Sequence, residues 1–412
     1  MTAGGPAWLF AISVSRVGAY MIYIAYAATL PVLQREWHLS GTGAGSIASA
    51  FQLAYAVSLM ASSELADRIG ARRVFLIGTV ASTVATVAFA AFARDYWSGL
   101  VLYTVLALTL GGTYTTGIML VAENVPTARR GGAMGWFIAG HSLGLALALA
   151  VTGVALPLGG YVMAFWLLAV GPLVGGGVAW VAIRSTPNVV TPRVGAPRFG
   201  PAVLKNRPAM LVTAGYTLHS WELLGMWAWT PAFLAACFVA SGTELTRGAG
   251  LGAYIVALFH VTGTLASVVA GVLADRLGRT PVIFMMASAS AVCSLTFGWL
   301  LDAPLGLVIV VGLVYGFTAL GDSPIYSTAI TEVVPAAYRG SALALRSLLG
   351  YGAGAAAPLA FGAILDWHGG SSVAGWGWAF VSLGIAGIGA VLCVLLLHRA
   401  PEASALRGAP ST

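Results

Sequence analysis

The chain has 412 residues, of which 59% are hydrophobic and 8% are charged. A soluble globular protein carries about a quarter charged residues, so this composition excludes an ordinary water-soluble domain. The formal net charge of +7 raises the question of an acidic partner, which the placement of the basic residues answers below.

Apolar stretches of a length that crosses a hydrocarbon core of about 30 Å recur along the whole chain. We predict twelve transmembrane helices, and they leave no room for a soluble domain between them. The predicted spans are 8–33, 43–63, 73–92, 97–122, 131–153, 158–183, 209–236, 248–273, 281–301, 304–331, 340–365 and 373–398.

The first span is too long for a signal-peptide core, lacks a cleavage site of small residues, and is therefore expected to remain as helix 1. The cysteines Cys237, Cys293 and Cys393 have no paired spacing, which predicts packing residues and neither a disulfide framework nor a metal site. No cofactor motif is found either.

The basic residues fall mainly on one side of the predicted layout. With both termini inside, fifteen of the twenty Lys and Arg face the cytoplasm, whereas only Arg35, Arg94 and Arg247 face the other side. This asymmetry is the positive-inside bias of membrane proteins. The chain is therefore expected in the inner (plasma) membrane with both termini cytoplasmic, surrounded by lipid, as a monomer and with no nucleic-acid partner.

Residues 184–208 form the longest polar stretch, with five prolines and five basic residues. We interpret it as a cytoplasmic linker between an N-terminal six-helix bundle (1–183) and a C-terminal one (209–398), followed by a cytoplasmic tail (399–412). The two halves repeat two motifs. Residues 63–73 match 271–279, with Asp67 and Asp275 208 positions apart, and residues 123–131 match 332–340 at an offset of 209.

The first motif resembles the Gly-x-x-x-Asp-Arg-x-Gly-Arg-Arg signature of the major facilitator superfamily, with Ser63 and Ala71 as departures. Together with the six-plus-six layout, the resemblance covers the whole chain. It implies two pseudo-symmetric bundles that rock about a central site. It also implies a gating role for the motif residues, listed here: Asp67, Arg68, Gly70, Arg72, Asp275, Arg276, Gly278 and Arg279.

In this gating role, a carboxylate at the end of helix 2 or 8 lies against the positive N-terminus of helix 11 or 5 and favours closure of the cytoplasmic side. Gly70 and Gly278 permit the tight turns. The alternative is a loop kept for topology alone.

Ionisable groups deep in apolar helices are costly and usually face a cavity. Four are found: Arg16, Glu222, Asp322 and Arg346. His141, His219 and His260 add groups that titrate near neutral pH. Glu222 and Asp322 are the candidates for proton coupling.

Polar residues accompany these charges at helical spacing. Tyr20 and Tyr23 share a face with Arg16, and His260 shares one with Thr264 and Ser267. The resemblance implies a cavity lined by helices 1, 4, 7 and 10. The predicted substrate-binding residues are Arg16, Tyr20, Tyr23, Gln52, Tyr114, His260, Tyr326 and Arg346.

Two interpretations of the arginines remain open. Their planar forks suit an oxyanion, so at least one can meet an anionic substrate, or both can pair permanently with Glu222 and Asp322 as clasps between the bundles. The tyrosines can be plain packing residues, and each histidine can be a hydrogen-bonded helix contact.

The function expected is secondary active transport of a small, anionic solute by alternating access, with proton coupling as an option. The alternative is a multidrug or metabolite exporter of the same fold. Such exporters usually have an arginine in helix 4 and a Gly-Pro-rich signature in helix 5. Helix 4 here has no arginine, and the Gly171–Gly176 string lies in helix 6.

No enzyme motif is present, and a transport-inactive sensor is a further alternative.

Overall fold

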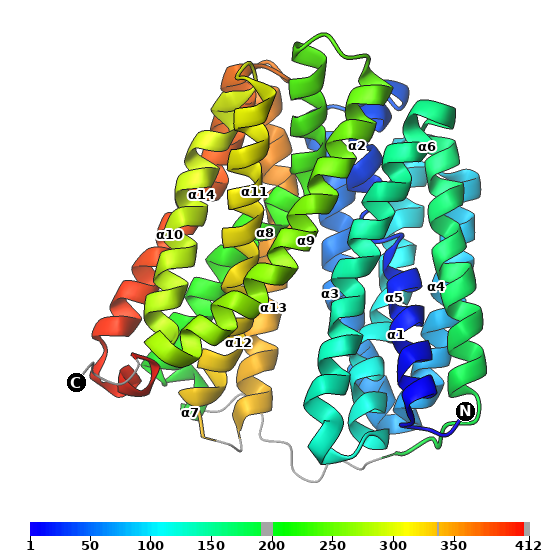
Figure 1. Ribbon diagram of the computed structural model, residues 1–412, viewed down its shortest axis with the longest axis vertical. Coiled ribbons are helices and arrows are strands. Elements are labelled where there is room, and N and C mark those ends of the chain that lie inside the picture. The colour runs from blue at the N-terminus through cyan, green and yellow to red at the C-terminus, as the bar shows by residue number, and fades with distance from the viewer. Residues whose placement is uncertain (191–200, 336–337, 408–412) are drawn as a thin grey trace. The chain divides into compact units, whose positions relative to one another are not determined.

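The computed structural model describes residues 1–190, 201–335 and 338–407. Parts of the predicted linker (191–200) and tail (408–412) therefore lie outside the described residues. The described chain is helical throughout (Figure 1). Its α-helices are α1 (Pro6–Tyr20), α2 (Ala25–Glu36), α3 (Gly41–Ile69), α4 (Ala71–Phe92), α5 (Tyr96–Asn124), α6 (Thr127–Ile183), α7 (Pro201–Leu204), α8 (Arg207–Ala240), α9 (Leu245–Leu277), α10 (Arg279–Phe297), α11 (Leu305–Gly321), α12 (Ser323–Glu332), α13 (Arg339–Trp367) and α14 (Val373–Arg399). Two 3₁₀ helices follow α10 and α14, η1 (Gly298–Leu300) and η3 (Pro401–Leu406).

Eleven segments of the described chain are long and apolar enough to cross a membrane. One of them, Gly132–Ile183, has 52 residues, about 78 Å of helix, which is more than twice the hydrocarbon core. It is interrupted at Gly159 and Gly160, and Gly160 has a φ of 65° that glycine adopts without strain. The segment therefore supplies two spans, and the all-helical membrane fold is confirmed.

Two predicted spans are broken inside the apolar stretch. The span predicted at 8–33 consists of α1 and α2, separated at Met21–Ile24, and the span predicted at 304–331 consists of α11 and α12, separated at Asp322. Irregular backbone at membrane depth is tolerated only where the protein satisfies the freed polar groups. Both breaks therefore need partners from neighbouring helices.

The chain divides into two compact units, and their boundaries fall between α2 and α3, inside α3, between residues 194 and 195, and inside α8 and α9. The first unit comprises Met1–Leu39, Ser46–Val194 and Leu234–Ala257, and the second comprises Ser40–Gly45, Gly195–Phe233 and Leu258–Thr412. The division into residues 1–183 and 209–398 as bundles stays a prediction.

Within the first unit, α1 packs closely on the second half of α6. A side chain at Gly18 would meet the carbonyl oxygen of Gly171 and the Cα of Gly175. Small residues let two membrane helices approach in this way. The Gly171–Gly176 string therefore holds α1 in place, and it positions Arg16 two residues away from Gly18.

In the second unit, aromatic rings of α8, α10, α13 and α14 form a compact cluster. The ring of Phe233 lies 4.7 Å from that of Phe297 and 5.2 Å from that of Phe380, measured between centroids. Aromatic pairs at these separations stabilise beyond their buried area. This cluster packs α8, which carries Glu222, and α13, which carries Arg346, against α10 and α14.

Candidate functional site

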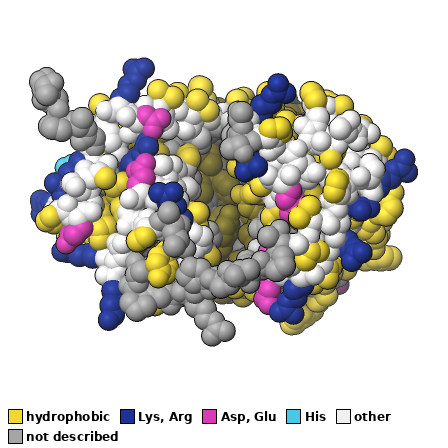
Figure 2. All heavy atoms as spheres, turned by 90° about the horizontal axis from the view of Figure 1, so that it is seen from below, with side chains coloured by type: hydrophobic (Ala, Val, Ile, Leu, Met, Phe, Trp, Pro, Cys, Tyr) yellow, Lys and Arg dark blue, Asp and Glu magenta, His cyan; other side chains and the backbone are white. Residues whose placement is uncertain are grey.

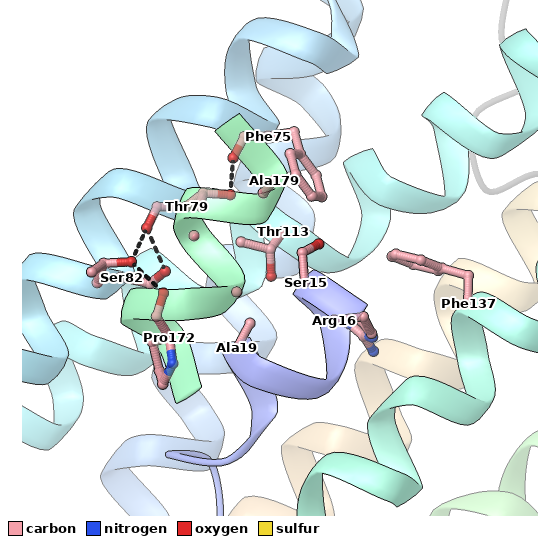
Figure 3. Close-up of a pocket in the computed structure, with 13 residues that line it drawn as sticks. Ser15, Arg16, Ala19, Phe75, Thr79, Ser82, Thr113, Phe137, Pro172 and Ala179 are labelled. Carbon is pink, nitrogen blue, oxygen red and sulfur yellow. Dashed lines mark hydrogen bonds between the residues drawn. The ribbon is translucent and has the colours of Figure 1, made fainter. Parts of the chain in front are cut away.

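Arg16 lies on α1 among aromatic rings of the first unit. Its side chain is buried, with 3% exposed. The guanidinium carbon lies 3.7 Å from the ring centroid of Tyr20, 4.4 Å from that of Tyr114 and 5.2 Å from that of Phe137. Figure 3 shows Arg16 and Phe137 at the end of the pocket away from Thr79 and Ser82. The predicted residues Arg16, Tyr20 and Tyr114 are thus brought together.

Two nitrogens of the Arg16 guanidinium have no hydrogen-bond partner in the described part of the chain. Nε and Nη1 are both buried and donate no hydrogen bond. Ring faces attract the guanidinium charge but leave its in-plane N–H groups unpaired. A buried donor without an acceptor costs about 1 to 3 kcal/mol. The geometry therefore calls for an acceptor, and an oxyanion would supply one.

A cavity of about 10 Å³ adjoins Arg16 and is lined by Ser15, Thr79, Ser82 and Thr113, among others (Figure 3). This is about the space of one water molecule. The hydroxyl of Thr79 donates to Phe75 O and that of Thr113 to Leu110 O, each at 2.8 Å. These hydroxyls donate to their own helices, and their oxygens accept no hydrogen bond from Nε or Nη1 of Arg16.

The break between α1 and α2 leaves backbone groups outside the α-helical hydrogen-bond pattern, close to Tyr20 and Tyr23 of the first unit. Met21, Tyr23 and Ala25 donate their amides three residues back, to Gly18, Tyr20 and Ile22, which is a 3₁₀ pattern. The hydroxyl of Tyr103 on α5 donates to the carbonyl of Tyr23. The freed backbone is thus satisfied from α5, as the membrane interior requires.

Tyr20 and Tyr23, on either side of this break, contact α3. The hydroxyl of Tyr23 donates to Oε1 of Gln52 at 2.8 Å, and the hydroxyls of Tyr20 and Tyr55 are hydrogen-bonded to each other. The His141 ring of α6 lies 4.5 Å from the Tyr20 ring. The predicted residues Tyr23 and Gln52 are therefore joined directly, and Tyr55 belongs to the same cluster.

Arg346 occupies a similar environment in the second unit. Its guanidinium carbon lies 4.0 Å from the ring centroid of Tyr216, and Nη1 donates to the hydroxyl of Ser327 at 2.6 Å. Nε is buried and without a hydrogen-bond partner among the described residues. Tyr326 lies close by, with its ring 5.9 Å from that of Tyr216.

The two candidate carboxylates have different surroundings. Glu222 Oε1 accepts hydrogen bonds from the hydroxyls of Ser290 and Ser294 on α10, both at 2.6 Å. Asp322 Oδ1 lies 3.3 Å from Nδ1 of His219 on α8. Within the second unit neither carboxylate forms an ion pair with Arg346 among the described residues.

His260 lies away from the Arg346 group. Its ring contacts Trp227, at a centroid distance of 5.5 Å. The hydroxyls that share its helix face bond their own helix, Thr264 to the carbonyl of His260 and Ser267 to that of Gly263. The polar stripe of α9 is thus largely satisfied within the helix.

The two repeated motifs, residues 63–73 and 271–279, form tight turns. Gly70 and Gly278 have φ of 92° and 95°, which favours glycine. In the first turn, Asn188 donates to the carbonyl of Ile69 at 2.9 Å, and Arg72 donates to the carbonyl of Arg184. The start of the linker is therefore attached to the motif.

Ion pairs surround the motif residues as well. Arg68 pairs with Glu64, and Arg279 pairs with Asp275 at 2.5 Å and with Glu332 at 3.0 Å. Figure 2 shows Lys and Arg side chains recurring over the face that is seen from below. The placement of Asp67 or Asp275 against another helix's N-terminus stays a prediction, and Arg276 is an exposed residue at the end of α9.

Sequence reasoning missed Phe137 and Tyr216 as site residues, and it named His219 only as a titratable group. An apolar ring on an apolar helix carries no signal. His219 and Tyr216 lie on α8 about one turn and two turns from Glu222, so their spacing held a usable signal. Among the described residues no group of three His, Cys, Asp or Glu could hold a metal ion.

A helical membrane chain with broken spans, buried arginines and two repeated motifs has the architecture of a multi-pass transporter. The family model described as Major Facilitator Superfamily matches residues 11–246 and 240–412. The chain therefore belongs to the major facilitator superfamily, whose members are membrane transporters, and it is not an enzyme.

Two relatives are named as transport proteins. The chain is 26% identical over 396 residues to the cis,cis-muconate transport protein of Acinetobacter baylyi, covering 92% of this chain and 91% of that one. It is 25% identical over 357 residues to the probable 4-methylmuconolactone transporter of Cupriavidus pinatubonensis, covering 83% and 79%.

The fold is similar to that of a solved transporter. The crystal structure of a mutant of the nucleoside transporter NupG superposes with a TM-score of 0.78 over 95% of this chain and 100% of that one, at 14% identity. The likeness at this identity concerns the fold alone.

Proposed function

We propose that this protein is a secondary transporter of small organic anions that binds the anion through Arg16. The observation that carries the proposal is the buried guanidinium with Nε and Nη1 unpaired between the rings of Tyr20 and Tyr114. A charge at mid-bilayer costs at least about 2.5 to 3.5 kcal/mol. Aromatic faces offset part of that cost, and a carboxylate in the plane of the fork offsets the rest.

The proposal favours substrate over a permanent clasp. In the first unit no described carboxylate forms an ion pair with Arg16. In the second unit Glu222 is bonded by two serines and Asp322 lies beside His219. The carboxylates that a clasp would use already have partners of their own. The organic-anion substrates in the names of both relatives agree with this choice.

The aromatic cluster gives the proposed site its shape. Beside the Arg16 group lie the hydrogen-bonded hydroxyls of Tyr20 and Tyr55 and the Tyr23 hydroxyl, which donates to Oε1 of Gln52. Flat apolar ring surface with a few fixed polar groups is typical of small-molecule sites. Such a site would bind the carboxylate at Arg16 and the carbon skeleton against the rings.

Uptake into liposomes tests the proposal. Purified protein would be reconstituted and assayed for counterflow of labelled cis,cis-muconate, a monocarboxylate, an uncharged nucleoside and a lipophilic cation. We expect counterflow of at least one carboxylate, its loss in Arg16→Gln, and no counterflow of the other two compounds. Transport of the cation alone would support the exporter function and contradict the proposal.

A further inference from the structure

The break between α11 and α12 places a carboxylate at membrane depth. Asp322 stands between Gly321 and Ser323, and Pro324 has no amide to continue the helix. The carbonyl of Leu320, four residues before the proline, accepts instead from Ser267 on α9 at 3.2 Å. The break is therefore held by a neighbouring helix, and Asp322 is fixed at it.

The Asp322 carboxylate contacts the His219 ring and the backbone amides of Asp322 and Ser323. Its side chain is 1% exposed, and Oδ1 accepts no hydrogen bond among the described residues. That oxygen lies 3.3 Å from Nδ1 of His219, whereas Nε2 of the same ring lies 2.7 Å from the hydroxyl of Ser323. The imidazole thus bridges the carboxylate and a hydroxyl that follows it in sequence.

This bridge can hold a proton in two places. A serine hydroxyl donates or accepts, so Ser323 matches either protonation state of Nε2. The gap between Nδ1 and Oδ1 suits one shared hydrogen after a small movement. A proton added here forms either an N–H bond on His219 or an O–H bond on Asp322, and no other bond changes.

The surrounding charges leave the pair able to exchange that proton. Arg346 donates a hydrogen bond to Ser327, and its guanidinium lies over the Tyr216 ring. Because it forms no ion pair with Asp322 among the described residues, it does not keep that side chain permanently in the carboxylate form. The other titratable groups that face the pair from the packed helices are Tyr216 and Glu222 of α8, Tyr326 of α12 and Cys393 of α14.

Glu222 differs because its carboxylate is already bonded by two hydroxyls. Ser294, which donates to it, also lies 2.6 Å from the hydroxyl of Tyr315. A side chain at Gly387 on α14 would lie 3.0 Å from Oε2. The group is closely packed among α8, α10, α11 and α14, which favours a structural network.

We propose that Asp322 and His219 together form the proton-carrying site that drives anion accumulation. The inference rests on the proposed anion transport. One proton binds to the pair on one side of the membrane and leaves on the other side in each cycle. The anion site at Arg16 and the proton site belong to different units of the chain.

Liposomes loaded with a pH-sensitive dye test the pair, with cis,cis-muconate as probe and the membrane potential clamped at zero. One proton per anion under a gradient of about one pH unit supports about tenfold accumulation. We expect Asp322→Asn and His219→Gln to lose that accumulation and the dye signal while counterflow continues. Glu222→Gln and the exposed control Asp302→Asn should accumulate as wild type does.

The outcomes separate the two proposals. Absence of counterflow in the wild type for every carboxylate of the panel contradicts anion transport itself. Counterflow without proton movement in the wild type, accumulation that survives in His219→Gln, or uncoupling by Glu222→Gln alone contradicts the proton site only. Because Asp322→Asn can fail to fold, His219→Gln alone suffices to overturn the inference, and size-exclusion profiles check that each variant is folded.

Discussion

The hydroxyl of Tyr23 donates a 2.8 Å hydrogen bond to Oε1 of Gln52, which joins the broken first span to α3. Both side chains are buried. Tyr23→Phe should lower the free energy of unfolding by about 1 to 3 kcal/mol, because it leaves a buried oxygen without a donor. Unfolding in mixed detergent micelles measures this change.

The matched control removes both partners. Tyr23→Phe combined with Gln52→Met should recover most of the loss, since two apolar groups of similar shape leave nothing unpaired. Equal losses in the single and double variants would show that the hydrogen bond does not hold this contact.

A second prediction concerns the stability of the turn at Gly70, in the first repeated motif, where Asn188 lies against the glycine. A Cβ at Gly70 would lie 2.3 Å from Asn188 Oδ1, and the residue has a φ of +92°. Gly70→Ala should cost about 1 to 3 kcal/mol from backbone strain alone. In the double variant Gly70→Ala, Asn188→Ala the contact with the Asn188 side chain is gone, but the backbone strain at position 70 stays. Thermal melting should therefore show that the second change restores only part of the lost stability.

Gly177→Ala serves as its control, because that helical glycine has open space around its Cβ position. There the alanine should be neutral or stabilising by up to about 1 kcal/mol, through helix propensity. A Gly70→Ala variant as stable as Gly177→Ala would be incompatible with the turn described.

The orientation of the chain in the membrane is a third prediction. The basic asymmetry predicts that Thr412 and the linker near Gly195 lie on the cytoplasmic side. Reporter fusions at both positions should give the inner-side signal, and a fusion at Gly242, in the turn between α8 and α9, should give the opposite one. Different signals from the first two fusions would rule out this layout.

Hydropathy predicts the spans because their length is set by the membrane, but it does not predict where they break. The break at Met21–Ile24 has no proline or glycine inside it, and tertiary contacts such as Tyr103 on Tyr23 stabilise it. The break at Asp322 could have been expected, since Gly321 and Pro324 flank it.

The site was predictable where charge or spacing carried the signal. Arg16, Tyr20 and Tyr114 converge as expected, because a buried guanidinium needs compensation. The polar face of α9 was a weaker guide: Thr264 and Ser267 donate to carbonyls of their own helix, so hydroxyls at helical spacing do not by themselves indicate a cavity.

The role of Arg16 is the central claim, and anion affinity measured beside thermal stability tests it most directly. Arg16→Lys and Arg16→Gln would be compared with the exposed control Arg35→Gln and with the double change Arg16→Gln, Glu222→Gln. Arg16→Lys should lose about tenfold or more in affinity, because a point ammonium does not reproduce the planar fork. Stability should change little, since no described carboxylate of the first unit is left unpaired. Unchanged affinity in Arg16→Gln, or stability lost in that variant and restored in the double change, would contradict the account.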